Sequence, residues 1–139
     1  MELNLNQVNH KIMPQICIGT VNQVGNNYDK YISNLKGAID IGYNHIDCAC
    51  GYGIPFDRMK EILHYGIATY GRENFWITWK SDTINLEHIK ELLEKLELAY
   101  FDLFLIHHDN ICNYRKLETL AIIKYLTLIR NYYQLNSKY

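Results

Sequence analysis

The sequence predicts an α/β protein with parallel strands, built from four strand–helix units in chain order. Short apolar runs recur along the chain at roughly the 30-residue spacing of one such unit. Each run is followed by a segment in which apolar residues recur with the period of a helix. Strands that alternate with amphipathic helices are typical of a parallel sheet with helical crossovers.

The apolar runs are the predicted strands, and they are Gln15–Gly19, Asn44–Cys48, Phe75–Thr78 and Phe101–His107. Ahead of the first strand, Glu2–Asn6 and Lys11–Met13 flank a polar stretch and could form a small β-hairpin. The alternation of strands and helices does not distinguish a small doubly wound sheet from half of an eight-stranded barrel.

The predicted helices carry apolar stripes and suitable end residues. The stripes comprise Ile32, Leu35 and Ile39; Phe56, Met59, Leu63 and Ile67; and Leu86, Ile89, Leu93 and Leu96. Gly42 and Gly71 are positioned to end the first two helices, whereas Pro55 suits the first turn of the second and Asn85 the N-cap of the third. A fourth helix is expected from about Lys116 to Tyr133.

Composition excludes several classes of protein. The 139 residues fit one domain, residues 1–139, and a net charge of -1 provides no basic stripe for nucleic acid or anionic lipid. No apolar run approaches the roughly 18 residues of a spanning helix, and the N-terminus lacks the apolar core of a secretory signal. The cysteines form no disulfide framework; they are Cys17, Cys48, Cys50 and Cys112. We therefore expect a cytoplasmic protein without nucleic-acid or membrane partners.

Four chemically different side chains fall where predicted strands end: Asp47, Tyr52, Lys80 and His107. The carboxyl ends of parallel strands share one edge of a sheet, which is where sites gather in such folds. Each residue taken singly also has a structural explanation: a turn cap, a packing ring, a solvated lysine or a core histidine. No Gly-rich phosphate-binding fingerprint follows the first strand.

Four segments in order resemble the motifs of the aldo-keto reductase family, over about residues 11–109. GYNHIDCACGYG at Gly42–Gly53 is similar to GYRHIDTAxxYG, and MPQICIGT at Met13–Thr20 to MPxLGLGT. FWITWK at Phe75–Lys80 resembles FITSK, and LLEKLELAYFDLFLIH at Leu92–His107 resembles SLKKLxLDYVDLYLIH. The resemblance implies that the chain is a single truncated domain: the parallel (βα)4 N-terminal half of a TIM-type (β/α)8 barrel.

The resemblance also implies NADPH-dependent reduction of an aldehyde or ketone to an alcohol. In that family the four rim residues form the catalytic group. Tyr52 would protonate the carbonyl oxygen, Lys80 would lower the pKa of that phenol, Asp47 would hold Lys80, and His107 would orient the carbonyl. Thr20 and Asp47 would line the cofactor site.

Departures from the family pattern leave an alternative open. The chain ends after about four of eight units, and by the resemblance the other half supplies most contacts to NADPH. Cys48, Ile54, Pro55, His108 and Val21 also replace usual family residues. The alternative is therefore a truncated or degenerate relative without turnover. A half-barrel has unpaired edges, so a homodimer or a second, complementing chain is the expected partner.

A metal site is a third hypothesis. Its ligands would come from His107, His108, Asp109 and Cys112, with Cys48 and Cys50. Strand alternation sends His107 and His108 to opposite faces, and a CxC pair is a weak signal. We therefore expect no bound metal.

Overall fold

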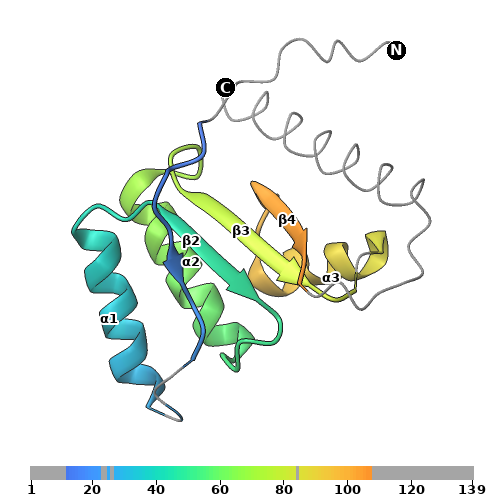
Figure 1. Cartoon of the computed structure of the whole chain (residues 1–139), viewed down its shortest axis with the longest axis horizontal. Helices are drawn as coiled ribbons and strands as arrows, with labels where there is room; N and C mark the ends of the chain where they lie inside the picture. The colour runs from blue at the N-terminus through green and yellow to red at the C-terminus, as the bar shows by residue number, and fades with distance from the viewer. Residues whose placement is uncertain (1–11, 23–24, 26, 84, 108–139) are drawn as a thin grey trace.

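A computed structural model describes residues 12–22, 25, 27–83 and 85–107 of the chain. Within it, four parallel strands form one sheet in the order β1-β2-β3-β4 (Figure 1). They are β1 (Ile18–Gly19), β2 (His45–Ala49), β3 (Trp76–Ser81) and β4 (Leu103–Ile106). The helices between them are α1 (Tyr28–Asp40), α2 (Phe56–Tyr70) and α3 (Leu86–Leu96). The predicted parallel strand–helix order is confirmed over these residues.

Two predicted elements lie largely outside the described residues. The fourth helix, Lys116–Tyr133, falls there entirely. Of the predicted hairpin, only Ile12 and Met13 are described, and neither lies in a strand. None of the helices in the described part of the chain has the length and hydropathy of a membrane-spanning segment.

The core lies between the sheet and the helices. α1 packs on α2, and α2 packs on α3, so the helices follow the strand order along the sheet (Figure 1). Ile46 and Cys48 of β2 and Ile77 and Trp79 of β3 belong to this core and are almost completely buried. Because side chains alternate along a strand, the residues between them face away from the helices.

The face of the sheet opposite the helices is polar in β2 and β3. His45 Nε2 lies 2.9 Å from Thr78 Oγ1, and Trp76 Nε1 donates to the same hydroxyl at 3.2 Å. Two residues further along each strand, on the same face, Lys80 Nζ donates to Asp47 Oδ2 at 2.7 Å. Strand register explains this pairing, since Asp47 is level with Thr78 and Ala49 with Lys80.

All four predicted helix-end residues lie at helix ends, and Gly42 follows the C-cap of α1, where its N–H donates to Ile39 O at 3.1 Å. The Asn85 side chain accepts a hydrogen bond from His88 N, as an N-cap does. Pro55 is the N-cap of α2, and Gly71 is its C-cap at φ 81°, a conformation that favours glycine. Of the predicted stripes, Phe56 is the main exception, because it lies in the first turn of α2 and is 37% exposed. Ile62, further along the same helix and not in the predicted stripe, is fully buried.

Three strands differ in length from their apolar runs. β1 is shorter than Gln15–Gly19, because Ile16 and Cys17 are exposed and pair with no strand in the described part of the chain. β4 is shorter than Phe101–His107. Phe101 packs in the core ahead of it. β3 is longer than predicted and continues to Ser81, so Lys80 lies within the strand rather than after it.

A buried ion pair explains why β4 begins late. The Asp102 side chain is 0% exposed, and its Oδ2 accepts from Arg72 Nη1 and from the backbone N–H of Ile77, both at 2.8 Å. Arg72 also donates to the carbonyl oxygens of Phe75 and Tyr100. Asp102 therefore joins the α2–β3 turn to the start of β4, and its own N–H donates to Ile77 O of β3 at 2.9 Å just ahead of the ladder.

Candidate active site

An aspartate–lysine ion pair forms the base of the candidate site at the carboxyl ends of β2 and β3. Lys80 Nζ lies 2.7 Å from Asp47 Oδ2, and the two side chains are 18% and 23% exposed. Burial by itself lowers the pKa of Lys80, but hydrogen bonding to Asp47 and to Tyr52 raises it above its ordinary value. Lys80 is therefore held as an ammonium ion.

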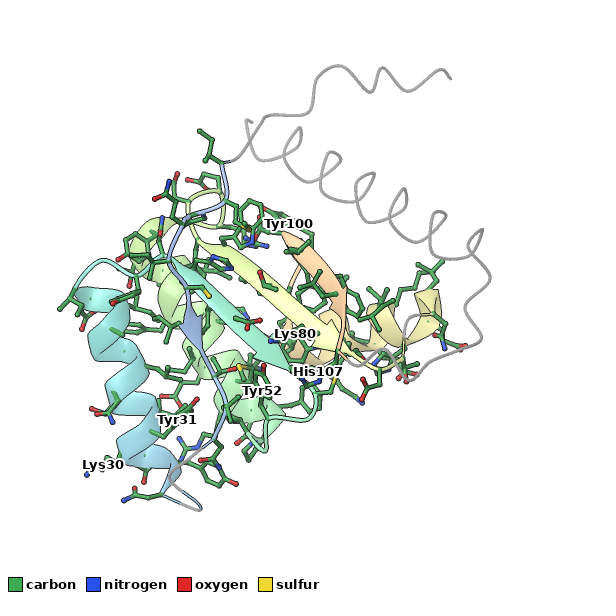
Figure 2. The ribbon with its side chains drawn as sticks, viewed as in Figure 1. Lys30, Tyr31, Tyr52, Lys80, Tyr100 and His107 are labelled. Carbon is green, nitrogen blue, oxygen red and sulfur yellow. The ribbon has the colours of Figure 1, made fainter. Side chains whose placement is uncertain are left out.

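The phenol of Tyr52 stands beside this ammonium group. Lys80 Nζ lies 4.9 Å from the centroid of the Tyr52 ring, and Figure 2 shows both side chains at the same end of the sheet. Tyr52 follows β2 in a tight turn, in which its N–H donates to Ala49 O at 3.3 Å. Cys50 N donates to Lys80 O at 3.2 Å, so this turn is tied to β3.

His107 completes the group, directly after β4. Its ring meets the Tyr52 ring edge-on, with centroids 5.3 Å apart and an angle of 79° between planes (Figure 2). The imidazole packs against the turn after β2, since a Cβ on Gly51 would lie in ordinary van der Waals contact with His107 Cε1, at 3.7 Å. The structure therefore brings together all four residues that the sequence placed at the rim. Their catalytic roles stay predictions.

Thr20 lies beneath the site rather than in it. It is 0% exposed, and both its backbone N–H and its hydroxyl donate to Asp47 O at 3.0 Å. The hydroxyl is thus occupied within the protein, so Thr20 supports the backbone of Asp47. Its contact with a cofactor remains a prediction.

Asp47 retains hydrogen-bonding capacity. Its Oδ1 atom is buried and has no hydrogen-bond partner within the described residues. A buried carboxylate oxygen without a donor is unfavourable, so this acceptor is suited to a hydroxyl donor from a ligand. Sugar hydroxyls of a dinucleotide cofactor are donors of this kind, and the residue therefore fits the group that the family uses.

Cys48, which stands where the family usually has threonine, is not part of this site. It is 0% exposed and faces the helices. Burial raises the pKa of its thiol to about 12. A protonated, buried thiol is neither a good nucleophile nor a metal ligand.

The metal hypothesis finds no support in the described part of the chain. No group of three or more His, Cys, Asp or Glu residues there could hold an ion. Cys50 is exposed and Cys48 faces the helices, so the CxC pair does not converge. His108, Asp109 and Cys112 lie outside the described residues.

Comparison with known proteins identifies the family. The sequence model of the Aldo/keto reductase family matches residues 15–131. The NADP-dependent D-sorbitol-6-phosphate dehydrogenase of Malus domestica is 38% identical over 81 residues, which cover 53% of this chain and 26% of that protein. Methylglyoxal reductase DkgA of Escherichia coli (strain K12) is 33% identical over 100 residues, covering 69% of this chain and 34% of DkgA.

Solved structures agree with the fold. An aldo-keto reductase complexed with NADPH superposes with a TM-score of 0.63 at 26% identity, covering 81% of this chain and 40% of that one. A thermostable aldo-keto reductase bound to the inhibitor epalrestat gives 0.63 at 27% identity, covering 81% and 44%.

The chain belongs to the aldo-keto reductase family. It spans about a quarter to a third of the length of the curated relatives that it matches. Its four-stranded sheet matches part of the barrel in the solved relatives, which confirms the predicted fold class of a half-barrel.

Several residues that shape the site were not singled out from the sequence. Asn22 donates from its backbone to Tyr52 O at 3.0 Å and from its side chain to Gly53 O at 3.4 Å. Ser81 and His88 are hydrogen-bonded to each other behind Lys80. Loop and helix-surface polar residues carry no periodic signal, so only the folded structure reveals these contacts.

Proposed function

We propose that this chain supplies the proton-transfer group of an NADPH-dependent carbonyl reductase, which converts an aldehyde or ketone into an alcohol. The observation that carries the proposal is the position of the Tyr52 phenol between the Lys80 ammonium group and the His107 imidazole. Relatives in the family support it, since they include an NADP-dependent D-sorbitol-6-phosphate dehydrogenase and an NADPH-dependent codeinone reductase.

Bound NADPH would supply the hydride that reaches the carbonyl carbon. As negative charge develops on the carbonyl oxygen, Tyr52 donates its phenolic proton to that oxygen and forms the alcohol. Lys80 stabilises the resulting phenolate by charge, and Asp47 fixes Lys80 through the 2.7 Å ion pair. His107 donates a hydrogen bond that orients the carbonyl.

Of the described residues, Asp47 is the one we expect to hold the cofactor, through its spare carboxylate oxygen. Thr20 would contribute by fixing the backbone of Asp47. We further propose a small carbonyl compound as substrate and a second copy of the chain, or a separate chain, as the source of strands that pair with its open edges.

The decisive experiment is a titration of the purified 139-residue chain with NADPH, followed by cofactor fluorescence. Saturable binding is expected, together with loss of NADPH when methylglyoxal is added as a probe aldehyde. Absence of any fluorescence change at millimolar cofactor would overturn the proposal. That outcome would favour the alternative, a family relative that keeps the fold without turnover.

A further inference from the structure

A buried serine at the carboxyl end of β3 joins three segments next to the site. Ser81 is 3% exposed, and its Oγ lies 3.1 Å from His88 Nε2 on α3. The same Oγ accepts a hydrogen bond from Thr83 N at 3.1 Å. The Ser81 carbonyl accepts one from His107 N, also at 3.1 Å. Ser81 thus binds the loop after β3, the first turn of α3 and the residue after β4.

Ser81 Oγ and His88 are each held by two hydrogen bonds. The backbone N–H of Thr83 donates to Ser81 Oγ, and the same hydroxyl is hydrogen-bonded to His88 Nε2 with a direction that follows the histidine tautomer. His88 is itself fixed, since its backbone N–H donates to the Asn85 cap at 2.8 Å. The imidazole is therefore held by the start of a capped helix, which is a rigid support.

Ser81 and Lys80 serve opposite faces of β3. Ile77 and Trp79 face the helices, and alternation places Ser81 on that side while Lys80 lies on the other. The last two residues of the strand therefore have different contacts. Lys80 pairs with Asp47 and contacts Tyr52, whereas Ser81 is hydrogen-bonded to His88 of α3.

We propose that Ser81 and His88 are positioning residues for His107. Their hydrogen bond holds the end of β3 where the Ser81 carbonyl fixes the backbone of His107, and hence the imidazole that meets Tyr52 edge-on at 5.3 Å. The consequence for carbonyl orientation rests on the proposed function, whereas the positioning itself does not.

The positioning is tested by backbone amide exchange of His107 in the ¹⁵N-labelled chain, measured by NMR. His88→Leu and Ser81→Ala each remove the hydrogen bond and should speed the exchange by about two- to tenfold, the range that one lost hydrogen bond produces. His88→Gln keeps a side chain that can donate or accept this hydrogen bond and should restore most of the protection. Two independent variants keep the test decisive if one of them fails to fold.

His64→Leu is the matched control. His64 lies on α2, and its Nε2 is 2.9 Å from Leu96 O, so this variant also removes one histidine hydrogen bond between a helix and its neighbour. It should leave His107 exchange unchanged. Unchanged exchange in both His88→Leu and Ser81→Ala, or equal acceleration in His64→Leu, would overturn the proposal.

Kinetics tests the functional consequence separately. With a carbonyl substrate, His88→Leu should raise KM more than it lowers kcat, and His88→Gln should restore KM, because His107 orients the substrate and Tyr52 is untouched. If the chain fails to bind NADPH, the exchange experiment still decides the positioning. Faster exchange with unaltered KM and kcat would contradict a role of this pair in catalysis.

Discussion

At the scale of single residues, the site depends on the positive charge of the Lys80 side chain, which its neighbours keep protonated. Lys80 is largely buried, yet Asp47 and Tyr52 keep its pKa above the ordinary value. The ammonium group lies 4.9 Å from the centroid of the Tyr52 ring, so a positive charge stands beside the phenol that we propose as the proton donor.

Replacing Tyr52 tests this assignment directly. Tyr52→Phe should lower carbonyl reduction by about a hundredfold or more, the usual contribution of a general acid, while circular dichroism stays unchanged. Lys80→Met should also lower it, because the phenolate loses its counter-charge. Tyr43→Phe is the control, since Tyr43 lies at the amino end of β2 and should have no effect. Retained activity in Tyr52→Phe would exclude this phenol as the acid.

A second tyrosine should make the stability of the protein sensitive to alkali. Burial, with a smaller effect of Cys48, raises the pKa of Tyr31 from 10.0 to about 12. The folded state therefore holds this proton more tightly than the unfolded chain. Stability from this source is complete below pH 10 and is lost as the pH rises towards 12.

Urea unfolding at neutral pH and in this alkaline range measures the effect. Wild type should lose stability as the pH rises, and Tyr31→Phe should lose less of its own neutral-pH value. The exposed Tyr43 provides the comparison, because Tyr43→Phe should follow the wild-type curve. Parallel curves for wild type and Tyr31→Phe would contradict the assignment.

At the scale of elements, close approach of α2 to the sheet depends on one glycine. Gly66 is buried in α2, and a Cβ there would overlap the ring of Phe75, which is 0% exposed. An aromatic ring between a helix and a strand has little room to move aside. Glycine in a helix interior is otherwise unfavourable, so steric fit explains its presence here.

Two glycine-to-alanine variants separate these effects. Gly66→Ala should lower the free energy of unfolding by about 1–3 kcal/mol through overpacking, less the fraction of a kcal/mol that alanine gains in helix propensity. Gly37→Ala in α1 meets nothing within 4 Å and should raise it by about 0.5–1 kcal/mol. Urea denaturation measures both, and a stabilised Gly66→Ala would show that Phe75 can move.

At the scale of the whole molecule, the sheet has two open edges within the described residues. β1 pairs only with β2, and β4 pairs only with β3. Apolar side chains near these edges are exposed, with Ile16 at 67%, Leu105 at 40% and Ile106 at 44%. Unpaired strands with apolar side chains favour association, and barrel closure removes such edges.

The mass of the 139-residue chain in solution tests the predicted pairing. We expect a dimer by light scattering, because two four-stranded halves can pair edge to edge. Leu105→Lys, which places a charge on the open strand, should shift the equilibrium towards monomer. A wild-type monomer at high concentration would contradict self-pairing.

The sequence alone was enough to predict the order of strands and helices, the family and the four rim residues. Periodicity and motif order suffice for these, because a strand end is a position along the chain and parallel strands bring their ends to one edge. The sequence could therefore predict that four side chains lie close together, those of Asp47, Tyr52, Lys80 and His107.

The contacts that support those residues could be established only from the folded structure. It showed that Thr20 holds the backbone of Asp47, that β3 extends to Ser81, and that Asp102 forms a buried ion pair with Arg72. These outcomes depend on which polar groups meet across 25 or more residues of sequence, as in the Arg72–Asp102 pair. Local pattern carries no information about such contacts, because they form between segments that meet only when the core packs.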